Sequence, residues 1–158
     1  MHHPYYRMTA LIERLHRCFL DVVKVELDRF GVQDINNVQS LILYNIGMDE
    51  LTIGELTARG YYLGSNVSYN VKKMVENGYL AQERSQHDRR STRVRLTSKG
   101  QALRSRLETM FGRQADALET TGLRGGDVET LNATLRRLEG FWSGNLAYAP
   151  DQPVTSAA

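Results

Sequence analysis

The sequence predicts a mainly α-helical fold with one small β-hairpin, an α+β arrangement in a chain of 158 residues. Apolar residues recur at steps of three and four along most of the chain, which is the helical period. Residues 92–97 instead alternate polar and apolar side chains, which is the strand period. Proline occurs only at Pro4, Pro150 and Pro153, so this helix breaker is absent from the interior of the chain.

The N-terminal part of the chain predicts two helices. The first covers about residues 6–30, and Gly31 suits its end. The second runs from about Val38 to Ile46 and ends at Gly47, with Asp34 or Asn36 as the residue that caps its start. The first helix is predicted by apolar residues at helical spacing, namely Met8, Leu11, Ile12, Leu15, Phe19, Val22, Val23, Leu27 and Phe30.

The next segment predicts a helix-turn-helix. Thr52 is followed three residues later by Glu55, the spacing of a capping box that opens a short helix over about 53–59. A turn over 61–64 follows, and a further helix begins at Gly64 or Ser65 and runs to Asn77. Two helices joined by so tight a turn form a helix-turn-helix.

A hairpin and two long helices complete the predicted order. Residues 79–84 and 92–97 are predicted strands on either side of a polar loop. A helical pattern then begins near residue 97, breaks over 120–126, and resumes in a last helix capped by Asp127. The last helix turns an apolar stripe inward, made of Val128, Leu131, Leu135, Leu138, Trp142 and Leu146, and residues 147–158 are expected to form a disordered tail.

The helices at the two ends of the chain carry apolar stripes that need a partner surface. We expect residues 1–34 and 100–146 to form a helical dimerisation region that packs on a second copy, with residues 35–99 as a separate domain between them. Packing of the same helices on one another within a monomer is the alternative.

Positive charge is concentrated on the helix-turn-helix and hairpin. The whole chain has a net charge of +2, whereas residues 59–95 hold eight basic and three acidic residues. Such an excess on one motif is typical of a face that binds a polyanion such as nucleic acid.

A helical wheel divides residues 65–77 into two faces. Val67, Val71, Met74 and Val75 form the side expected to face the core. Asparagine and serine on the other side can contact base edges in a major groove, while lysines neutralise phosphates. Ser65 could instead act only as a helix cap, and Tyr69 could pack on the hairpin. The predicted DNA-binding residues of this helix are Ser65, Asn66, Tyr69, Asn70, Lys72 and Lys73.

The hairpin tip supplies a second group of predicted DNA-binding residues, Asp88, Arg89 and Arg90. Adjacent arginines on a protruding ribbon suit a narrow minor groove, whose negative potential attracts them. Phosphate would repel Asp88, so we expect this carboxylate to pair with Arg90 or to cap the loop. A charged tip without a DNA role is the alternative.

These segments resemble the MarR family of winged helix-turn-helix regulators. The resemblance is carried by residues 51–56 (Leu-Thr-Ile-Gly-Glu-Leu), Val67, and 71–80 (Val-Lys-Lys-Met-Val-Glu-Asn-Gly-Tyr-Leu). Its most specific part is the spacing Asp-x-Arg-x-x-x-Val-x-Leu-Thr-x-x-Gly over residues 88–100. The chain departs from the family at Gly60-Tyr61-Tyr62-Leu63, where the family commonly has Leu-Gly-Leu-Ser.

The resemblance implies a fold and a function. It implies a winged helix-turn-helix protein that acts as a homodimer on double-stranded DNA with a palindromic operator, here expected to be a repressor. It also implies control by a small molecule or an oxidant held between the dimerisation and DNA-binding regions. The effector is unidentified, and Tyr44, Tyr61 and Tyr62 are possible residues of its pocket.

Other functions are less well supported by the residues. The lone Cys18 could sense oxidants, although a half-buried structural thiol fits its amphipathic helix better. The four histidines lack metal-ligand spacing, so no metal or cofactor is expected. Phosphate-binding loops and nucleophile elbows are absent, which argues against an enzyme. A winged-helix adaptor that binds protein instead of DNA is a further alternative. The sequence contains neither a membrane span nor a secretory signal, so we expect a cytoplasmic protein.

Overall fold

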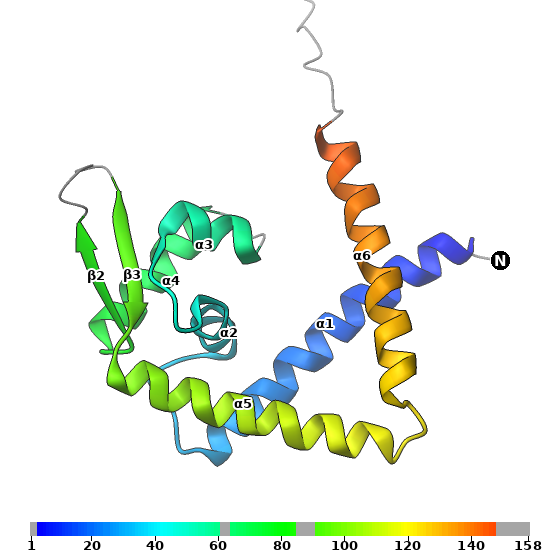
Figure 1. Ribbon diagram of the computed structural model, residues 1–158, viewed down its shortest axis with the longest axis horizontal. Coiled ribbons are helices and arrows are strands. Elements are labelled where there is room, and N and C mark those ends of the chain that lie inside the picture. Colours follow the sequence, from blue (N-terminus) through cyan, green and yellow to red (C-terminus); the bar gives the residue numbers. More distant parts are fainter. Residues whose placement is uncertain (1–2, 61–63, 85–90, 148–158) are drawn as a thin grey trace, which may run out of the picture. The chain divides into compact units, whose positions relative to one another are not determined.

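The computed structural model describes residues 3–60, 64–84 and 91–147 and confirms the mainly helical fold with a small sheet. The chain divides into two compact units, residues 1–111 and residues 112–158. The division into dimerisation and DNA-binding regions stays a prediction. The elements in chain order (Figure 1) are α1 (Pro4–Arg29), α2 (Asn37–Ile46), β1 (Leu51–Thr52), α3 (Ile53–Gly60), α4 (Gly64–Glu76), β2 (Leu80–Arg84), β3 (Thr92–Leu96), α5 (Ser98–Glu119) and α6 (Gly125–Ala147).

Side-chain caps fix the starts of α1 and α2. The first helical residue of α1 is Pro4, and the imidazole of His3 accepts a hydrogen bond from the Tyr5 N–H at 3.1 Å. Asn36, rather than Asp34, caps α2. Its side-chain oxygen accepts from the Gln39 N–H at 2.8 Å, and the Gln39 side chain accepts from the Asn36 N–H at 3.1 Å. This reciprocal pair satisfies two helix donors that would otherwise lack partners.

The capping box predicted before α3 is confirmed. The Glu55 N–H donates to Thr52 Oγ1 at 3.1 Å, and the Thr52 N–H donates to the Glu55 carboxylate at 2.7 Å. The α4 helix ends one residue earlier than predicted, at Glu76, and Gly78 then adopts a φ of +78°. A residue with a side chain would be strained there, so glycine at this position lets the chain turn from α4 into β2.

A third strand, β1, completes an antiparallel sheet with the order β1–β3–β2. Leu51 pairs with Val94, and Thr52 pairs with Arg93, on one edge of β3. The other edge of β3 pairs with β2, from Leu80 opposite Leu96 to Arg84 opposite Thr92. The sequence did not predict β1 because two residues are too few to show alternation.

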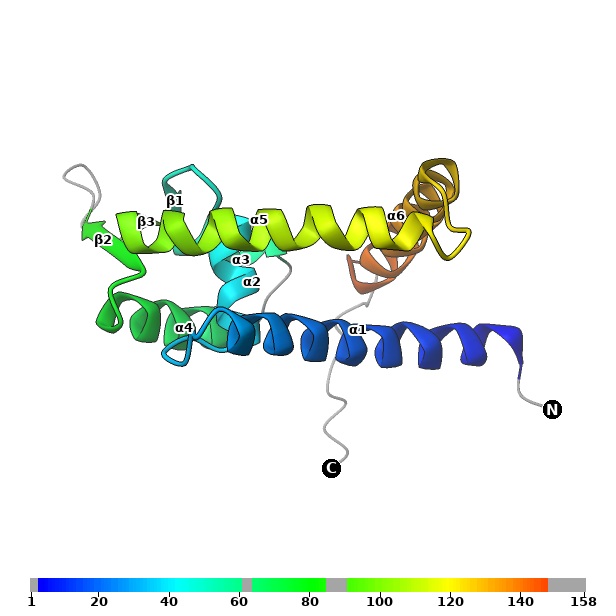
Figure 2. The same ribbon diagram turned by 90° about the horizontal axis from the view of Figure 1, so that it is seen from below.

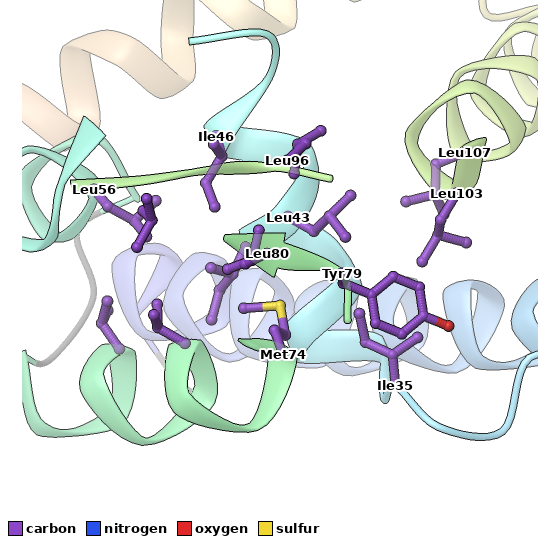
Figure 3. Packing of buried hydrophobic residues seen from close by; sticks show 14 of the residues in the cluster. Ile35, Leu43, Ile46, Leu56, Met74, Tyr79, Leu80, Leu96, Leu103 and Leu107 are labelled. Atoms are coloured by element: carbon purple, nitrogen blue, oxygen red, sulfur yellow. The ribbon is translucent and has the colours of Figure 1, made fainter. Parts of the chain in front are cut away.

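The core lies within residues 1–111 and is built by almost every element of that unit. Side chains from α2, α3, α4 and the two hairpin strands converge in Figure 3, and Leu103 and Leu107 of α5 join them. Full burial of one such side chain is worth roughly 1.5–3 kcal/mol. Representative fully buried members are Ile42, Leu43, Ile46, Leu56, Val67, Met74, Val94, Leu107 and Met110.

The C-terminal helix differs from the prediction in its cap. The α6 helix begins at Gly125, so Asp127 lies inside its first turn, where its carboxylate accepts from the Arg124 N–H at 2.9 Å. The predicted apolar stripe is open in the single chain, with Leu131 56% and Leu135 42% exposed. Ala147 belongs to α6, and the rest of the predicted tail, 148–158, lies outside the described residues.

A polar cluster joins the α1–α2 loop to the start of β2 and to α5. The Tyr79 hydroxyl donates to the Asp34 carboxylate at 2.5 Å, and Lys99 Nζ lies 2.5 Å from the same carboxylate. Lys99 also donates to the Asn77 carbonyl at 2.9 Å and lies 4.2 Å above the Tyr79 ring. Asn77 completes the cluster by donating to the Asp34 carbonyl at 2.7 Å.

The same contacts shift two pKa values in opposite directions. Partial burial raises the pKa of Asp34, but hydrogen bonds from Lys99 and Tyr79 outweigh it, so the net pKa is lowered. Burial, together with the hydrogen bond to Asp34, raises the pKa of Tyr79. The cluster is therefore held by an ionised carboxylate and a protonated phenol.

Gly100 brings α5 against the backbone that precedes β2. A Cβ atom at this position would lie 2.3 Å from the Tyr79 carbonyl oxygen, too close for any side chain. Thr97 is the single residue between β3 and α5. Figure 1 shows the strand leading directly into the helix, and Figure 2 shows the hairpin at the same end of α5 from below. Its hydroxyl donates to the Gly78 carbonyl at 2.6 Å, and its Oγ1 accepts from the Gly100 N–H at 3.2 Å.

Replacing Gly100 with alanine is expected to lower the free energy of unfolding by about 1–3 kcal/mol, because the new methyl group must displace backbone. Gly112→Ala on the same helix is the control, since open space surrounds that position. Alanine is the better helix former, so the control should gain about 0.5–1 kcal/mol. Urea unfolding measures both. A Gly100→Ala protein as stable as the unmodified chain would contradict the close approach.

Replacing Asp34 with asparagine is expected to lower the free energy of unfolding by an amount that depends on pH. A carboxyl with a lowered folded pKa stabilises the fold above its ordinary value near 3.8 and loses that effect as pH falls through the folded pKa. The stability difference between the unmodified chain and Asp34→Asn should therefore be full at pH 7 and shrink below about pH 4. Urea unfolding at a series of pH values measures it, and a pH-independent difference would contradict the ionised carboxylate.

Candidate nucleic-acid interface

The α3–α4 pair forms the predicted helix-turn-helix and turns one face of α4 to the core. Val67, Val71 and Met74 are buried there, and Val75 is half-buried, as the helical wheel predicts. Leu56 of α3 is fully buried in the same core. The apolar side of α4 therefore anchors the helix and leaves its opposite side to solvent.

The solvent side of α4 presents short polar side chains near its start and cations further along. Ser65 and Asn66 lie in the first turn and are exposed, and Tyr69, one turn on, is 61% exposed. Lys72 follows on the same side and is exposed. The high exposure of Tyr69 does not support the alternative in which it packs on the hairpin.

Two neighbouring lysines of α4 differ in their surroundings. Lys73 Nζ lies 3.1 Å from the Glu76 carboxylate, and this hydrogen bond, followed by the charge of Glu76, raises the pKa of Lys73. Lys72 has no ion-pair partner among the described residues. Lys72 is thus the lysine of this helix whose charge is most available to an incoming anion.

Asn70 points toward α2 instead of joining the exposed group. Its Oδ1 accepts from Gln39 Nε2 at 3.1 Å, and its Nδ2 donates to the Asn66 carbonyl at 2.8 Å. Both ends of the Asn70 carboxamide are occupied within the protein. The sequence placed Asn70 at the flank of the exposed face but gave no sign of this partnership.

The hairpin strands add arginines whose charge is partly balanced. Arg95 lies 3.5 Å from Glu83, its neighbour on β2. Hydrogen bonds from the Thr52 N–H and hydroxyl, then the charges of Arg93 and Arg59, lower the pKa of Glu55. Ion pairs of this exposed kind are weak individually, but they place acidic side chains beside part of the positive charge of this segment.

The hairpin tip lies outside the described residues, which end at Arg84 and resume at Ser91. The predicted site residues Asp88, Arg89 and Arg90 all fall in that interval, so their roles stay predictions. The same holds for Tyr61 and Tyr62 in the segment between α3 and α4.

A cavity of about 590 Å³ lies within residues 1–111, between α1, α2, the end of α3 and Phe111 of α5. Its lining is mostly apolar, and the Phe111 ring packs edge-on against Tyr44 with centroids 5.0 Å apart. Tyr44 was among the possible pocket residues from sequence. The sequence gave no signal for the other lining residues, which are His16, Phe19, Leu20, Val38, Leu41, Asn45, Gly60 and Phe111.

Three further sequence expectations can be compared with the structure. Cys18 is exposed in the single chain rather than half-buried, because its position on α1 faces away from the core. Within the described ranges, no three His, Cys, Asp or Glu side chains gather as a possible metal site. None of the helices in the same ranges is long and apolar enough to cross a membrane.

A helix-turn-helix followed by a β-hairpin, with a short third strand on the hairpin's edge, defines the winged helix-turn-helix class of proteins. Two solved structures share this fold with the chain. The MepR–DNA complex of S. aureus has a TM-score of 0.72 at 18% identity, covering 85% of this chain and 97% of MepR. FabT of Streptococcus pneumoniae in complex with DNA has a TM-score of 0.69 at 20% identity, covering 89% and 98%.

Sequence comparison gives the family. Residues 33–91 match the model of the MarR family. The exopolysaccharide II synthesis transcriptional activator ExpG of Rhizobium meliloti (strain 1021) is 40% identical over 143 residues, covering 90% of this chain and 73% of ExpG. The chain belongs to the MarR family of transcriptional regulators, which confirms both the predicted family and the prediction that it is not an enzyme.

Proposed function

We propose that the chain binds double-stranded DNA in a sequence-specific way, with α4 in the major groove. The observation that carries the proposal is the exposed polar side of α4, where Ser65, Asn66 and Tyr69 precede Lys72 on a buried apolar anchor. Serine and asparagine offer hydrogen bonds to base edges, and lysine neutralises phosphate. The structures of MepR and FabT bound to DNA support this use of the fold.

We also propose that the hairpin serves as a second DNA contact. Arg89 and Arg90 at its tip would reach the minor groove beside the site read by α4, with Asp88 pairing with Arg90 or capping the loop. The exposed arginines Arg84 and Arg93 on the strands extend the positive surface toward that tip.

A homodimer on a palindromic operator follows from the same proposal. The α1 helix exposes a row of large apolar side chains along its length, and α6 exposes Leu131, Leu135 and Phe141. Apolar rows of this extent are unfavourable in water and suit the contact between two copies. The α1 row consists of Leu11, Leu15, Phe19, Val22 and Val25.

The proposal also covers the direction of regulation and the binding site of an effector. Repression was expected from sequence, whereas the relative ExpG is named an activator, so a reporter fused to a bound promoter decides between them. We place an unidentified small-molecule effector in the 590 Å³ cavity, because its walls join α1 and α5 to Gly60 at the end of α3. A regulator that acts on chromosomal DNA would work in the cytoplasm.

Lys72→Ala is expected to weaken DNA binding equally on operator and random duplexes, because a phosphate contact carries no sequence information. The slope of log K against log salt should become less steep by about 1. Fluorescence anisotropy across a salt series, with DNA from upstream of the gene and a random duplex, measures both. Lys24→Ala on α1 removes the same charge away from α4 and should change neither. If the unmodified chain binds operator and random duplexes equally well, the result would contradict the proposed function and favour an adaptor.

Leu135→Glu is expected to convert the dimer to monomers, since a charge would be buried in the apolar contact between copies. Analytical ultracentrifugation measures the mass in solution. Met48→Glu is the control, because Met48 is 70% exposed in the α2–β1 loop, away from both apolar rows. A persistent Leu135→Glu dimer would exclude this part of α6 from the interface.

A further inference from the structure

A buried amide pair connects the first turn of α2 to the middle of α4. Gln39 is only 7% exposed, although its side chain is polar. Its Oε1 accepts from the Asn36 N–H at 3.1 Å, and its Nε2 donates to Asn70 Oδ1 at 3.1 Å. Asn70 extends this series of hydrogen bonds by donating from Nδ2 to the Asn66 carbonyl at 2.8 Å.

The hydrogen bonds allow one orientation of each amide. If Asn70 were turned over, its NH₂ group would face the NH₂ group of Gln39, and its oxygen would face the Asn66 carbonyl. If Gln39 were turned over, its NH₂ group would face the Asn36 N–H, and its oxygen would face Asn70 Oδ1. Each change sets donor against donor and acceptor against acceptor. The pair therefore has a single, directional geometry.

This geometry bears directly on the turn of α4 that carries Asn66. The apolar contacts of α4, through Val67, Val71 and Met74, hold it to the core but depend mainly on shape and volume. A buried hydrogen bond has a defined direction and is costly to leave unmade. The bond from Gln39 thus restricts rotation and sliding of α4 more sharply than the apolar side chains do.

We infer that Gln39 and Asn70 are positioning residues that set the orientation of α4 on α2, so that Asn66 and Ser65 meet the base edges. The inference rests on the proposed function, in which α4 reads DNA. It also assigns Asn70 a role different from the one expected from sequence: Asn70 aligns the reading residues and does not itself contact bases.

The test compares binding to operator and to random duplex by anisotropy, at a temperature where all variants are folded. Gln39→Met and Asn70→Leu each break the amide pair while keeping the length and branching of the side chain close to the original. Each is expected to lower the ratio of operator to random affinity about tenfold, the size of one misplaced base contact. The double variant should lose little more than either single variant, because both remove the same bond.

Two further variants separate positioning from stability. Ser40→Ala removes a fully buried hydroxyl that donates to the Asn37 carbonyl inside α2, and should lower the unfolding midpoint without changing the affinity ratio. Asn70→Asp keeps an acceptor for Gln39 Nε2 but sets its second oxygen against the Asn66 carbonyl, so it should retain only part of the ratio that Asn70→Leu loses. Its added negative charge weakens binding to both duplexes alike.

Three outcomes would overturn the inference. A reduced ratio in Asn70→Leu together with a normal ratio in Gln39→Met would mean that Asn70 contacts DNA itself. Normal ratios in both variants would mean that the amide pair is structural only. If the unmodified chain does not distinguish operator from random DNA, the proposed function fails and the inference fails with it. If the unmodified chain does distinguish them, the first two outcomes contradict the inference alone and leave the proposed function standing.

Discussion

The close approach of Gly100 to the Tyr79 backbone, together with the Asp34–Lys99–Tyr79 cluster, is the contact on which the rest of the unit formed by residues 1–111 depends. It lies where α4 has just ended, β2 begins, β3 ends and α5 begins. A glycine without a Cβ allows the approach, and a carboxylate shared by Tyr79 and Lys99 secures it at 2.5 Å to each. Helix α4 and the hairpin are held to the scaffold through this junction.

Local sequence signals predicted the parts of the fold that local chemistry decides. The Thr52–Glu55 capping box, the glycine turn at Gly78 and the alternation of β3 all act within a few residues, and each is present in the structure. The short β1 strand escaped prediction because only its pairing with Val94 and Arg93 defines it. Asp127 was predicted as the residue that precedes the helix, but it is the third residue of α6. The error arose because a carboxylate can accept from the free N–H groups at a helix start from either position.

Non-local contacts limited the prediction of the candidate site. A helical wheel separates the core side of α4 from its exposed side, which Val67 and Tyr69 confirm. It says nothing of a partner 31 residues away, so Asn70 was grouped with the DNA-facing residues although Gln39 holds it. The charge count was limited in the same way. It includes the acids Glu76 and Glu83 but does not show that they lie beside Lys73 and Arg95.

The single residue between β3 and α5 has a mechanical consequence. Thr97 is fixed at both sides by hydrogen bonds, so no loop is available to absorb motion between strand and helix. A turn of the first part of α5 would carry the sheet with it as one rigid piece. The five residues of β3 span about 16 Å, so a rotation of about 10° displaces the far end of the strand by about 3 Å. A shift of that size separates a hydrogen-bonded donor from its acceptor. Small angular changes in the first part of α5 are thus enough to break or restore contacts made at the far end of β3.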